Sequence, residues 1–414
     1  MSETTIRAEA RIQAIDGGIT APAGFRTAGV YAGIKPPTHA WPLDVMVLTA
    51  EAPVSAAAVF TTNQTQAAPV TVSRANLQSS GGRAKAIVCN SGCANACTGD
   101  AGMEVARSTV EFAASKLGCR RDEVLVASTG VIGVNLSLPK VQDGVLGAIA
   151  GLSRDAHRDA MLAIMTTDPF PKEAAVRVET HAGVFHVGGM AKGSGMIEPM
   201  MATMLGFLTC DAQVDPAMLR RVLTDVTRDT FNAITVDGEC STNDTVFAMA
   251  SGASGVAIDE SLYPALEAGL REVSKILAIG IVRGGEGATK LVSIRVSGAR
   301  EWAHAERAAR TIANSLLVKT AIHGGDPNWG RLVAAAGRAG VPFNLARAAV
   351  RIGGIVLFEQ GQPHDQNAEK AAAYLAGREI DIELDLGTGG AEQAVIWTCD
   401  LSAEYVRINA DYRT

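Results

Sequence analysis

Short apolar runs rich in β-branched residues recur along this chain, and runs of this kind are typical of strands. They predict strands at residues 85–90, 124–127, 175–179, 245–250, 291–296, 349–358, 380–386 and 394–401. Residues 380–386 alternate strictly between apolar and acidic side chains. Because successive side chains of a strand point to opposite faces, this run predicts a strand with one face toward solvent.

Helical periodicity separates several of these runs. Asp215 followed by Pro216 is typical of a helix start, with an N-cap side chain and a proline at the first helical position. Apolar residues then follow at helical spacing, and similar patterns predict helices at residues 104–117, 262–278 and 302–317.

The order of these elements shows no regular strand–helix alternation. It therefore predicts an α+β fold of layered helices and sheets rather than a doubly wound parallel sheet. A strand ends and a charged helix begins near residues 297–300. We expect a catalytic domain over residues 1–298 and a second, smaller C-terminal α/β domain over residues 299–414.

Composition and charge limit the classes of protein to which the chain can belong. Its 414 residues are 47% hydrophobic and 19% charged, as in a soluble globular protein of two or three structural units. The net charge of −6 is spread without a basic block, which argues against nucleic acid or an anionic membrane as partner. No run reaches the length of a membrane span, and residues 1–7 lack a signal-peptide core, so we expect a cytoplasmic protein.

The seven cysteines are an odd number and do not indicate a disulfide framework. Cys89, Cys93 and Cys97 recur every four residues, but a metal site needs a fourth ligand. The seven histidines show no zinc-type spacing. We expect buried or loop thiols and no metal, with a metal site at these cysteines as the alternative.

A threonine in the middle of the chain follows a glycine-rich stretch and the small residue Ala202. The hydroxyl of such a residue can attack the preceding carbonyl, and hydrolysis of the resulting ester leaves a new amino-terminal threonine. Its freed α-amine, with a pKa of roughly 8, can serve as general base for its own hydroxyl. The sequence therefore predicts self-cleavage between Ala202 and Thr203, with Thr203 as the nucleophile.

Other segments offer groups that such a nucleophile needs. Thr129 and Gly130 follow a predicted strand, where a hydroxyl and a backbone N–H can point at one oxyanion, although this pair is also typical of a plain turn. Residues 166–168 precede Pro169 and can simply end a helix. The glycine-rich stretch around Glu286 lacks the spacing of a phosphate-binding loop and is typical of an ordinary loop.

Taken in order, these and further segments resemble the ornithine acetyltransferase family, the bifunctional glutamate N-acetyltransferases of arginine biosynthesis. The resemblance runs the length of the chain. It covers residues 21–26, 32–35, 60–63, 67–70, 90–99, 128–132, 165–168, 191–197, 201–205, 234–238, 241–244, 285–290, 318–321, 326–331 and 409–414.

The resemblance implies a layered, self-processing Thr-nucleophile fold and a ping-pong reaction. N-acetylornithine acetylates Thr203, ornithine leaves, and glutamate takes the acetyl group to give N-acetylglutamate. It also implies cleavage into an α chain (residues 1–202) and a β chain starting at residue 203, which pair into an α2β2 heterotetramer. Neither a metal nor an organic cofactor is implied, and acetyl-CoA is a co-substrate only in the bifunctional form, which one sequence does not separate from the monofunctional form.

The resemblance also implies the site residues. Thr129 and Gly130 correspond to the oxyanion hole. The substrate-binding set corresponds to Thr166, Lys192, Thr203, Glu286, Asn409 and Thr414, so that the C-terminus contributes to the site. N-acetylornithine carries a carboxylate and an ammonium, so one cation (Lys192) and one anion (Glu286) suit it.

Four residues depart from the family pattern. Glu198 and Met200 stand just before the predicted cleavage point, Gly284 stands where the family has aspartate, and Cys93 stands where asparagine is common. Two other classes of function stay open on the residues alone. One is a self-processing amidohydrolase or aminopeptidase that passes the acyl group to water, and the other is a non-enzymatic amino-acid-binding protein.

Overall fold

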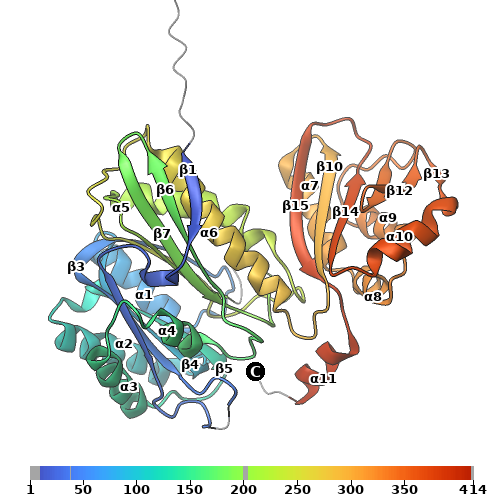
Figure 1. Ribbon diagram of the computed structural model, residues 1–414. Coiled ribbons are helices and arrows are strands. Elements are labelled where there is room, and N and C mark those ends of the chain that lie inside the picture. The colour runs from blue at the N-terminus through green and yellow to red at the C-terminus, as the bar shows by residue number, and fades with distance from the viewer. Residues whose placement is uncertain (1–9, 38, 199–203, 412–414) are drawn as a thin grey trace, which may run out of the picture.

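The computed structural model describes residues 10–37, 39–198 and 204–411, and its larger part is a nine-stranded sheet (Figure 1). The strand order is β1-β6-β7-β8-β9-β3-β4-β5, with β2 paired to β3. The strands are β1 (Arg11–Ile15), β2 (Phe25–Val30), β3 (Val45–Phe60), β4 (Arg83–Cys93), β5 (Val124–Val131), β6 (Glu173–Thr180), β7 (Gly183–Lys192), β8 (Leu205–Cys210) and β9 (Thr245–Ala250).

The long strand β3 joins the two halves of this sheet. Its first part pairs with β2 and β4, its last part pairs with β9, and the register shifts between Thr49 and Val54. Alternate β3 side chains enter different cores. Val45 packs in the core that includes side chains of α2 and α3, whereas Met46 packs with α4 and with Phe207 and Phe247.

Helices cover the sheet and bury its apolar faces. Helices α5 and α6 pack on β3, β6 and β7, and the others pack on β2 to β5. The N-cap predicted at Asp215 is confirmed, because its carboxylate accepts the Ala217 N–H at 2.8 Å. The helices are α1 (Ala68–Ser79), α2 (Gly99–Leu117), α3 (Leu138–Ala150), α4 (His157–Ile164), α5 (Pro216–Arg228) and α6 (Tyr263–Arg283), with short 3₁₀ turns η1 (Gly18–Thr20), η2 (Arg121–Glu123) and η3 (Phe231–Ala233).

A second sheet forms the smaller body, on the right in Figure 1, with strand order β13-β12-β11-β14-β10-β15. Helix α7 packs on β10 and β15, and α11 leaves this body and extends back toward the first (Figure 1). The elements are β10 (Leu291–Ala299), α7 (Trp302–Ala313), α8 (Leu316–Gly324), α9 (Trp329–Gly337), β11 (Ala349–Ile352), β12 (Ile355–Glu359), β13 (Gln362–Pro363), η4 (Asp365–Asn367), α10 (Ala368–Leu375), β14 (Glu379–Asp385), β15 (Glu392–Cys399) and α11 (Ala403–Asp411).

The predicted α+β class is confirmed, because both sheets mix parallel and antiparallel pairs. Strand pairs β4/β5, β8/β9 and β10/β14 are parallel, and the other pairs are antiparallel. The alternation at residues 380–386 is confirmed as well, since Ile380, Ile382 and Leu384 of β14 are buried while their neighbours face outward.

Two predicted elements are wrong in their extent. The strand expected at residues 349–358 is a hairpin of β11 and β12, because Gly353 and Gly354 both take positive φ and reverse the chain. The helix expected at residues 302–317 ends at Ala313, and a separate helix begins at Leu316. Asn314 closes the first helix, and its side chain is held by groups of the larger body.

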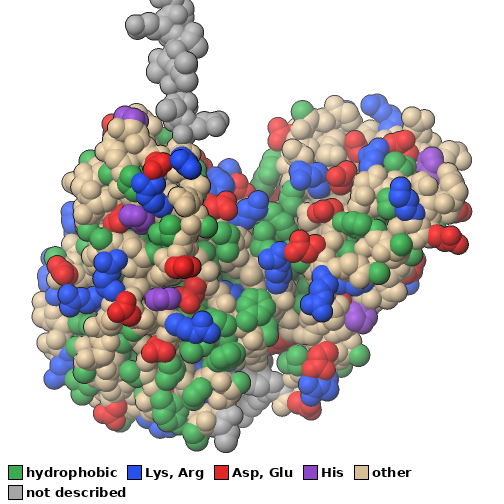
Figure 2. Space-filling model, viewed as in Figure 1, with side chains coloured by type: hydrophobic (Ala, Val, Ile, Leu, Met, Phe, Trp, Pro, Cys, Tyr) green, Lys and Arg blue, Asp and Glu red, His purple; other side chains and the backbone are tan. Residues whose placement is uncertain are grey.

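The charged surface agrees with the composition. Figure 2 shows acidic and basic side chains mixed over the visible face, without a patch of one sign. Within the described part of the chain, no helix has the length and apolar character needed to cross a membrane.

Candidate active site

The end of β5 carries the two groups predicted to bind an oxyanion. β5 pairs in parallel with β4, with Thr129 opposite Ser91 and Gly130 opposite Gly92. Gly130 takes a φ of 129°, and a Cβ there would lie 2.3 Å from the backbone carbon of Gly92. Only glycine therefore allows the two strand ends to lie this close and to turn toward the cleft.

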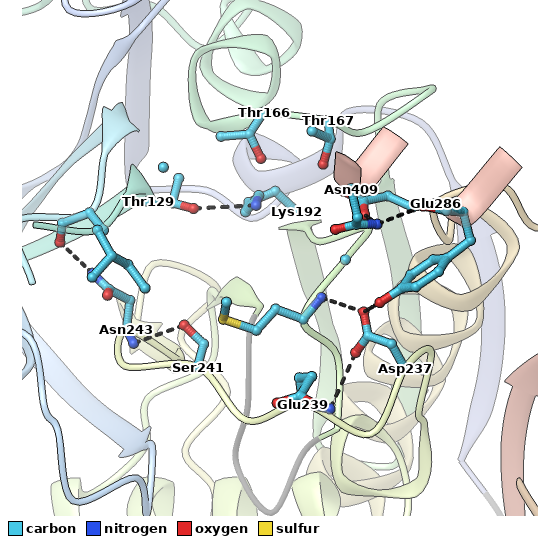
Figure 3. A pocket seen from close by; sticks show the side chains of 16 residues that line it. Thr129, Thr166, Thr167, Lys192, Asp237, Glu239, Ser241, Asn243, Glu286 and Asn409 are labelled. Atoms are coloured by element: carbon cyan, nitrogen blue, oxygen red, sulfur yellow. Dashed lines mark hydrogen bonds between the residues drawn. The ribbon is translucent and has the colours of Figure 1, made fainter. Parts of the chain in front are cut away.

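Lys192, the last residue of β7, lies beside this pair. Its side chain is buried, and its Nζ donates a hydrogen bond to Thr129 Oγ1 at 3.3 Å (Figure 3). An ammonium group has only donors, so the Thr129 oxygen accepts this bond and its own hydrogen is left to donate elsewhere. The cation thus polarises the hydroxyl that was predicted to contact an oxyanion.

Glu286 and Asn409 form a second polar group across the cleft. Glu286 is 7% exposed, and its Oε2 accepts a hydrogen bond from Asn409 Nδ2 at 2.9 Å. Helix α11 brings Asn409 there by packing against Gly287, where a Cβ would lie 2.5 Å from the Tyr405 nitrogen. Asn409, near the end of the described chain, thus lines the cleft.

These residues line one cleft of about 750 Å³, open to solvent (Figure 3). Thr129, Gly130, Thr166, Lys192, Glu286 and Asn409, all predicted from the sequence, are among its lining residues. Other lining residues are Ala94, Ile132, Thr167, Gly195, Met196, Asp237, Glu239, Ser241, Asn243 and Tyr405. The cleft thus has a cationic end at Lys192 and an acidic end at Glu286, which suits a small molecule that carries charges of both signs.

Comparisons with known proteins show similarity to one family along almost the whole chain. The profile of the ArgJ family matches residues 26–414. Two relatives are 45% and 47% identical to this chain. They are the arginine biosynthesis bifunctional proteins ArgJ of Parasynechococcus marenigrum (strain WH8102) and of Gloeobacter violaceus (strain ATCC 29082 / PCC 7421), respectively. Each alignment covers 97% of this chain, and 97% and 98% of the relative. The chain belongs to the ArgJ family. It is a transferase of arginine biosynthesis, and the family and enzyme expected from the sequence are confirmed.

Solved chains of ArgJ proteins are similar to part of the structure. The crystal structure of arginine biosynthesis bifunctional protein argJ from Bacillus halodurans is 41% identical, covers 51% of this chain and 100% of that chain, and gives a TM-score of 0.49. Ornithine acetyltransferase complexed with ornithine, from Mycobacterium tuberculosis, is 39% identical, covers 47% of this chain and 99% of that chain, and gives a TM-score of 0.42.

Ala202, Thr203 and Thr414 lie outside the described residues. The structure does describe Met204, which follows Thr203 directly. Its N–H donates to Asp244 Oδ1 at 2.8 Å. Burial raises the pKa of the Asp244 carboxyl well above its usual range, and the hydrogen bond from the Met204 N–H opposes this shift.

The sequence did not single out Asp237, which holds the segment before the predicted cleavage point. Its carboxylate accepts the N–H groups of Met196 and Ile197 at 2.7 and 2.8 Å and the hydroxyl of Tyr405 at 3.3 Å (Figure 3). In the sequence, Asp237 lies in a turn-rich stretch, and these three partners are 40 or more residues away on other segments. Only the positive φ of Met196, which is rare for a non-glycine residue, marks this loop locally, and it is visible only in the structure.

The cysteines near the cleft are thiols. Cys89 and Cys93 are buried, Cys97 is exposed, and all three are free. Burial raises the pKa of the Cys89 thiol to about 12, so it stays protonated and is a poor nucleophile or metal ligand. Among residues 10–37, 39–198 and 204–411, no group of three or more His, Cys, Asp or Glu side chains is arranged to hold a metal ion.

Proposed function

We propose that this enzyme transfers an acetyl group from N-acetylornithine to glutamate through an acetyl-Thr203 intermediate. The observation that carries this proposal is the cleft that gathers Thr129, Gly130, Lys192 and Glu286. In the sequence the cleavage point directly precedes Met204, and β8 begins at Leu205, next to Lys192 in the sheet. A nucleophile at Thr203 is therefore joined by a single residue to β8, which pairs with β7 beside the cleft residue Lys192.

The first half of the proposed reaction moves the acetyl group onto the enzyme. The Thr203 hydroxyl oxygen attacks the acetyl carbonyl of the donor while its proton passes to the Thr203 α-amine. The Thr129 hydroxyl and the Gly130 N–H donate to the negatively charged oxygen of the tetrahedral intermediate. The amide bond then breaks, the α-nitrogen of ornithine takes the proton, and ornithine leaves.

The second half returns the acetyl group to an acceptor. The α-amine of glutamate attacks the acetyl ester, the same two donors stabilise the second oxyanion, and the Thr203 oxygen takes back a proton. Lys192 suits a substrate carboxylate, and Glu286 with Asn409 suits the side-chain ammonium of N-acetylornithine. We also assign Thr166, Thr203 and Thr414 to the substrate-binding set.

The proposal includes processing and assembly. Self-cleavage between Ala202 and Thr203 gives an α chain of residues 1–202 and a β chain from residue 203, and two copies of each form a heterotetramer in the cytoplasm. We propose two domains, as expected from the sequence, but with the boundary moved from residues 298/299 to just before β10 (Leu291–Ala299), because that strand belongs to the sheet of the smaller body. Acetyl-CoA is the alternative acetyl donor in a bifunctional enzyme, and no metal or organic cofactor takes part.

An acetyl-transfer assay with N-acetylornithine and glutamate tests the reaction. Thr203→Ala should abolish transfer, and Thr203→Ser, which keeps a hydroxyl, should retain part of it. Transfer that survives in Thr203→Ala would remove Thr203 as the nucleophile. Release of free acetate without an acceptor, at the rate of transfer, would instead favour the amidohydrolase alternative.

A denaturing gel tests the cleavage independently. The active protein should run as two bands, each near half of 42.9 kDa, and Thr203→Ala should run as one band. A single full-length band from active protein would contradict self-cleavage.

A further inference from the structure

Behind the cationic end of the cleft lies a buried ion pair that the proposed reaction does not use. The side chains of Asp168 and Lys172 are 0% and 1% exposed, and Lys172 Nζ lies 2.6 Å from Asp168 Oδ1. Charges are rarely buried this deeply without a specific task, because removing them from water is costly.

The Asp168 carboxylate also binds the backbone at two places in the cleft wall. Its Oδ2 accepts the Thr166 N–H at 3.0 Å, and its Oδ1 accepts the Gly193 N–H at 2.7 Å. Gly193 directly follows Lys192. One side chain therefore fixes the backbone next to both Thr166 and Lys192, which come from separate segments.

The charge of this carboxyl is set by its neighbours. Burial alone would raise its pKa, but the ammonium groups of Lys172 and Lys192 and the Gly193 N–H hold the pKa well below its usual range. Asp168 is therefore ionised at any pH at which the enzyme works, and its hydrogen bonds are charge-assisted and strong.

We propose that Asp168 is a positioning residue for the substrate: its two carboxylate oxygens set the directions in which Thr166 and Lys192 enter the cleft. This inference rests on the proposed function, in which those two residues bind the substrate. Asp168 does not contact the substrate and acts only through the backbone that it holds.

An asparagine at position 168 cannot accept both backbone hydrogen bonds. Both carboxylate oxygens face donors, whereas an asparagine side chain offers one oxygen and one NH₂ group. In either orientation the NH₂ group faces a backbone N–H, so Asp168→Asn breaks at least one of the two bonds. Lys172→Met is the matched control, since it removes the other half of the ion pair and leaves both bonds in place.

The test compares steady-state kinetics of wild type, Asp168→Asn, Lys172→Met and the double variant Asp168→Asn/Lys172→Met. The double variant is included because removing both members of a buried pair is tolerated better than removing one. We expect KM for N-acetylornithine to rise about tenfold or more in both variants that lack Asp168, and to change about threefold or less in Lys172→Met. The kcat should change less than KM does, because Asp168 has no bond to Thr129 or Gly130 and reaches the Thr129 hydroxyl only through Lys192.

Amide hydrogen exchange separates this proposal from the proposed function. Peptides that contain Thr166 and Gly193 should exchange faster in both variants that lack Asp168, whatever the reaction catalysed. A folded double variant with unchanged KM and unchanged exchange would overturn the positioning role, as would equal losses in kcat and kcat/KM with KM unchanged. If wild type shows no transfer, the proposed function fails, and unchanged exchange would still refute the positioning by itself.

Discussion

At the scale of single residues, the hydrogen bond between Lys192 and Thr129 determines what the Thr129 hydroxyl can do. Its oxygen accepts a hydrogen bond from the Lys192 ammonium, so its own hydrogen is left to donate to another group, which in the proposed mechanism is the developing oxyanion. A donor held in this way by the protein needs no reorganisation during the reaction, which is the property that makes oxyanion sites effective.

Replacement of Thr129 by valine removes this donor and keeps the shape of the side chain. We expect kcat for acetyl transfer to fall by about 10²–10³ with a smaller change in KM, because the donor matters most in the transition state. Thr167→Val is the matched control, since Thr167 lines the same cleft and has no part in the proposed chemistry. Steady-state kinetics measure both, and a kcat within threefold of wild type in Thr129→Val would remove Thr129 from the oxyanion site.

Lys35 is a second residue whose state is set by its surroundings. It is 3% exposed and donates to the Met165 carbonyl at 3.0 Å. Burial lowers its pKa from 10.5 to about 8; Asp44 opposes this change, and the nearby Lys192 adds to it. The folded protein therefore loses this proton at a lower pH than the unfolded chain.

This difference in pKa predicts a dependence of stability on pH. Between pH 8 and 10.5 the unfolded chain binds more protons at this lysine, so its contribution to the free energy of unfolding becomes more favourable as pH rises. Urea unfolding at pH 8, 9 and 10 should therefore show wild type gaining stability relative to Lys35→Met. The exposed Lys370→Met should show no such trend relative to wild type, and a flat difference for Lys35→Met would contradict the lowered pKa.

At the scale of elements, the position of α11 decides whether the acidic end of the cleft is complete. The helix begins just after β15, in the smaller body, and reaches the cleft of the larger one. Ser402 Oγ donates to the Gly287 carbonyl at 2.6 Å, which fixes the start of the helix against the loop that carries Glu286.

Gly287→Ala should displace α11. The residue has a φ of 68°, and an alanine Cβ would meet the Tyr405 nitrogen at 2.5 Å. Gly118→Ala is the matched control, because its φ is 64° and the added Cβ has no neighbour within 4 Å. Backbone strain alone costs about 1 kcal/mol. Thermal unfolding should therefore show a larger loss for Gly287→Ala, with a raised KM for N-acetylornithine in that variant only; equal losses would mean that the contact with α11 does not matter.

Some helices and strands were predicted well from the sequence, and others were not predicted at all. The alternation in β14 and the N-cap of α5 are local signals, and both were read correctly. Strands β7 and β8 were not predicted. Both are buried over most of their length, so they lack the alternation of a half-exposed strand.

At the scale of the whole molecule, the two bodies contact each other beside the segment that precedes the predicted cleavage point. Thr235 N–H donates to the Trp397 carbonyl of β15 at 2.9 Å. The Thr235 hydroxyl contacts Asn314 Oδ1 at 2.7 Å, and Asn314 Nδ2 donates to Glu198. Glu198, which departs from the family pattern, is thus held by a residue at the end of α7 in the smaller body.

Loss of this connection should affect processing. Asn314→Ala removes both hydrogen bonds from the Asn314 side chain, and we expect the full-length chain to convert to two fragments several-fold more slowly. A time course on denaturing gels measures the conversion. Asn367→Ala is the control, because its side chain donates to the Val356 carbonyl within the smaller body only. Equal cleavage rates in Asn314→Ala and wild type would show that Glu198 does not need this support.

The sequence by itself determined the family, the enzyme and the separate motifs, because these depend on residue types and short spacings. Which of them meet was decided only by the tertiary structure. Thr129 and Lys192 are 63 residues apart, and Glu286 and Asn409 are 123 apart. Such contacts depend on the order of strands in a sheet and on the packing of α11 against the larger body. The spacing of apolar residues along the sequence predicts neither of them. For the same reason Asp168, which the sequence suggested only as a helix stop, was found to bind Gly193, 25 residues away.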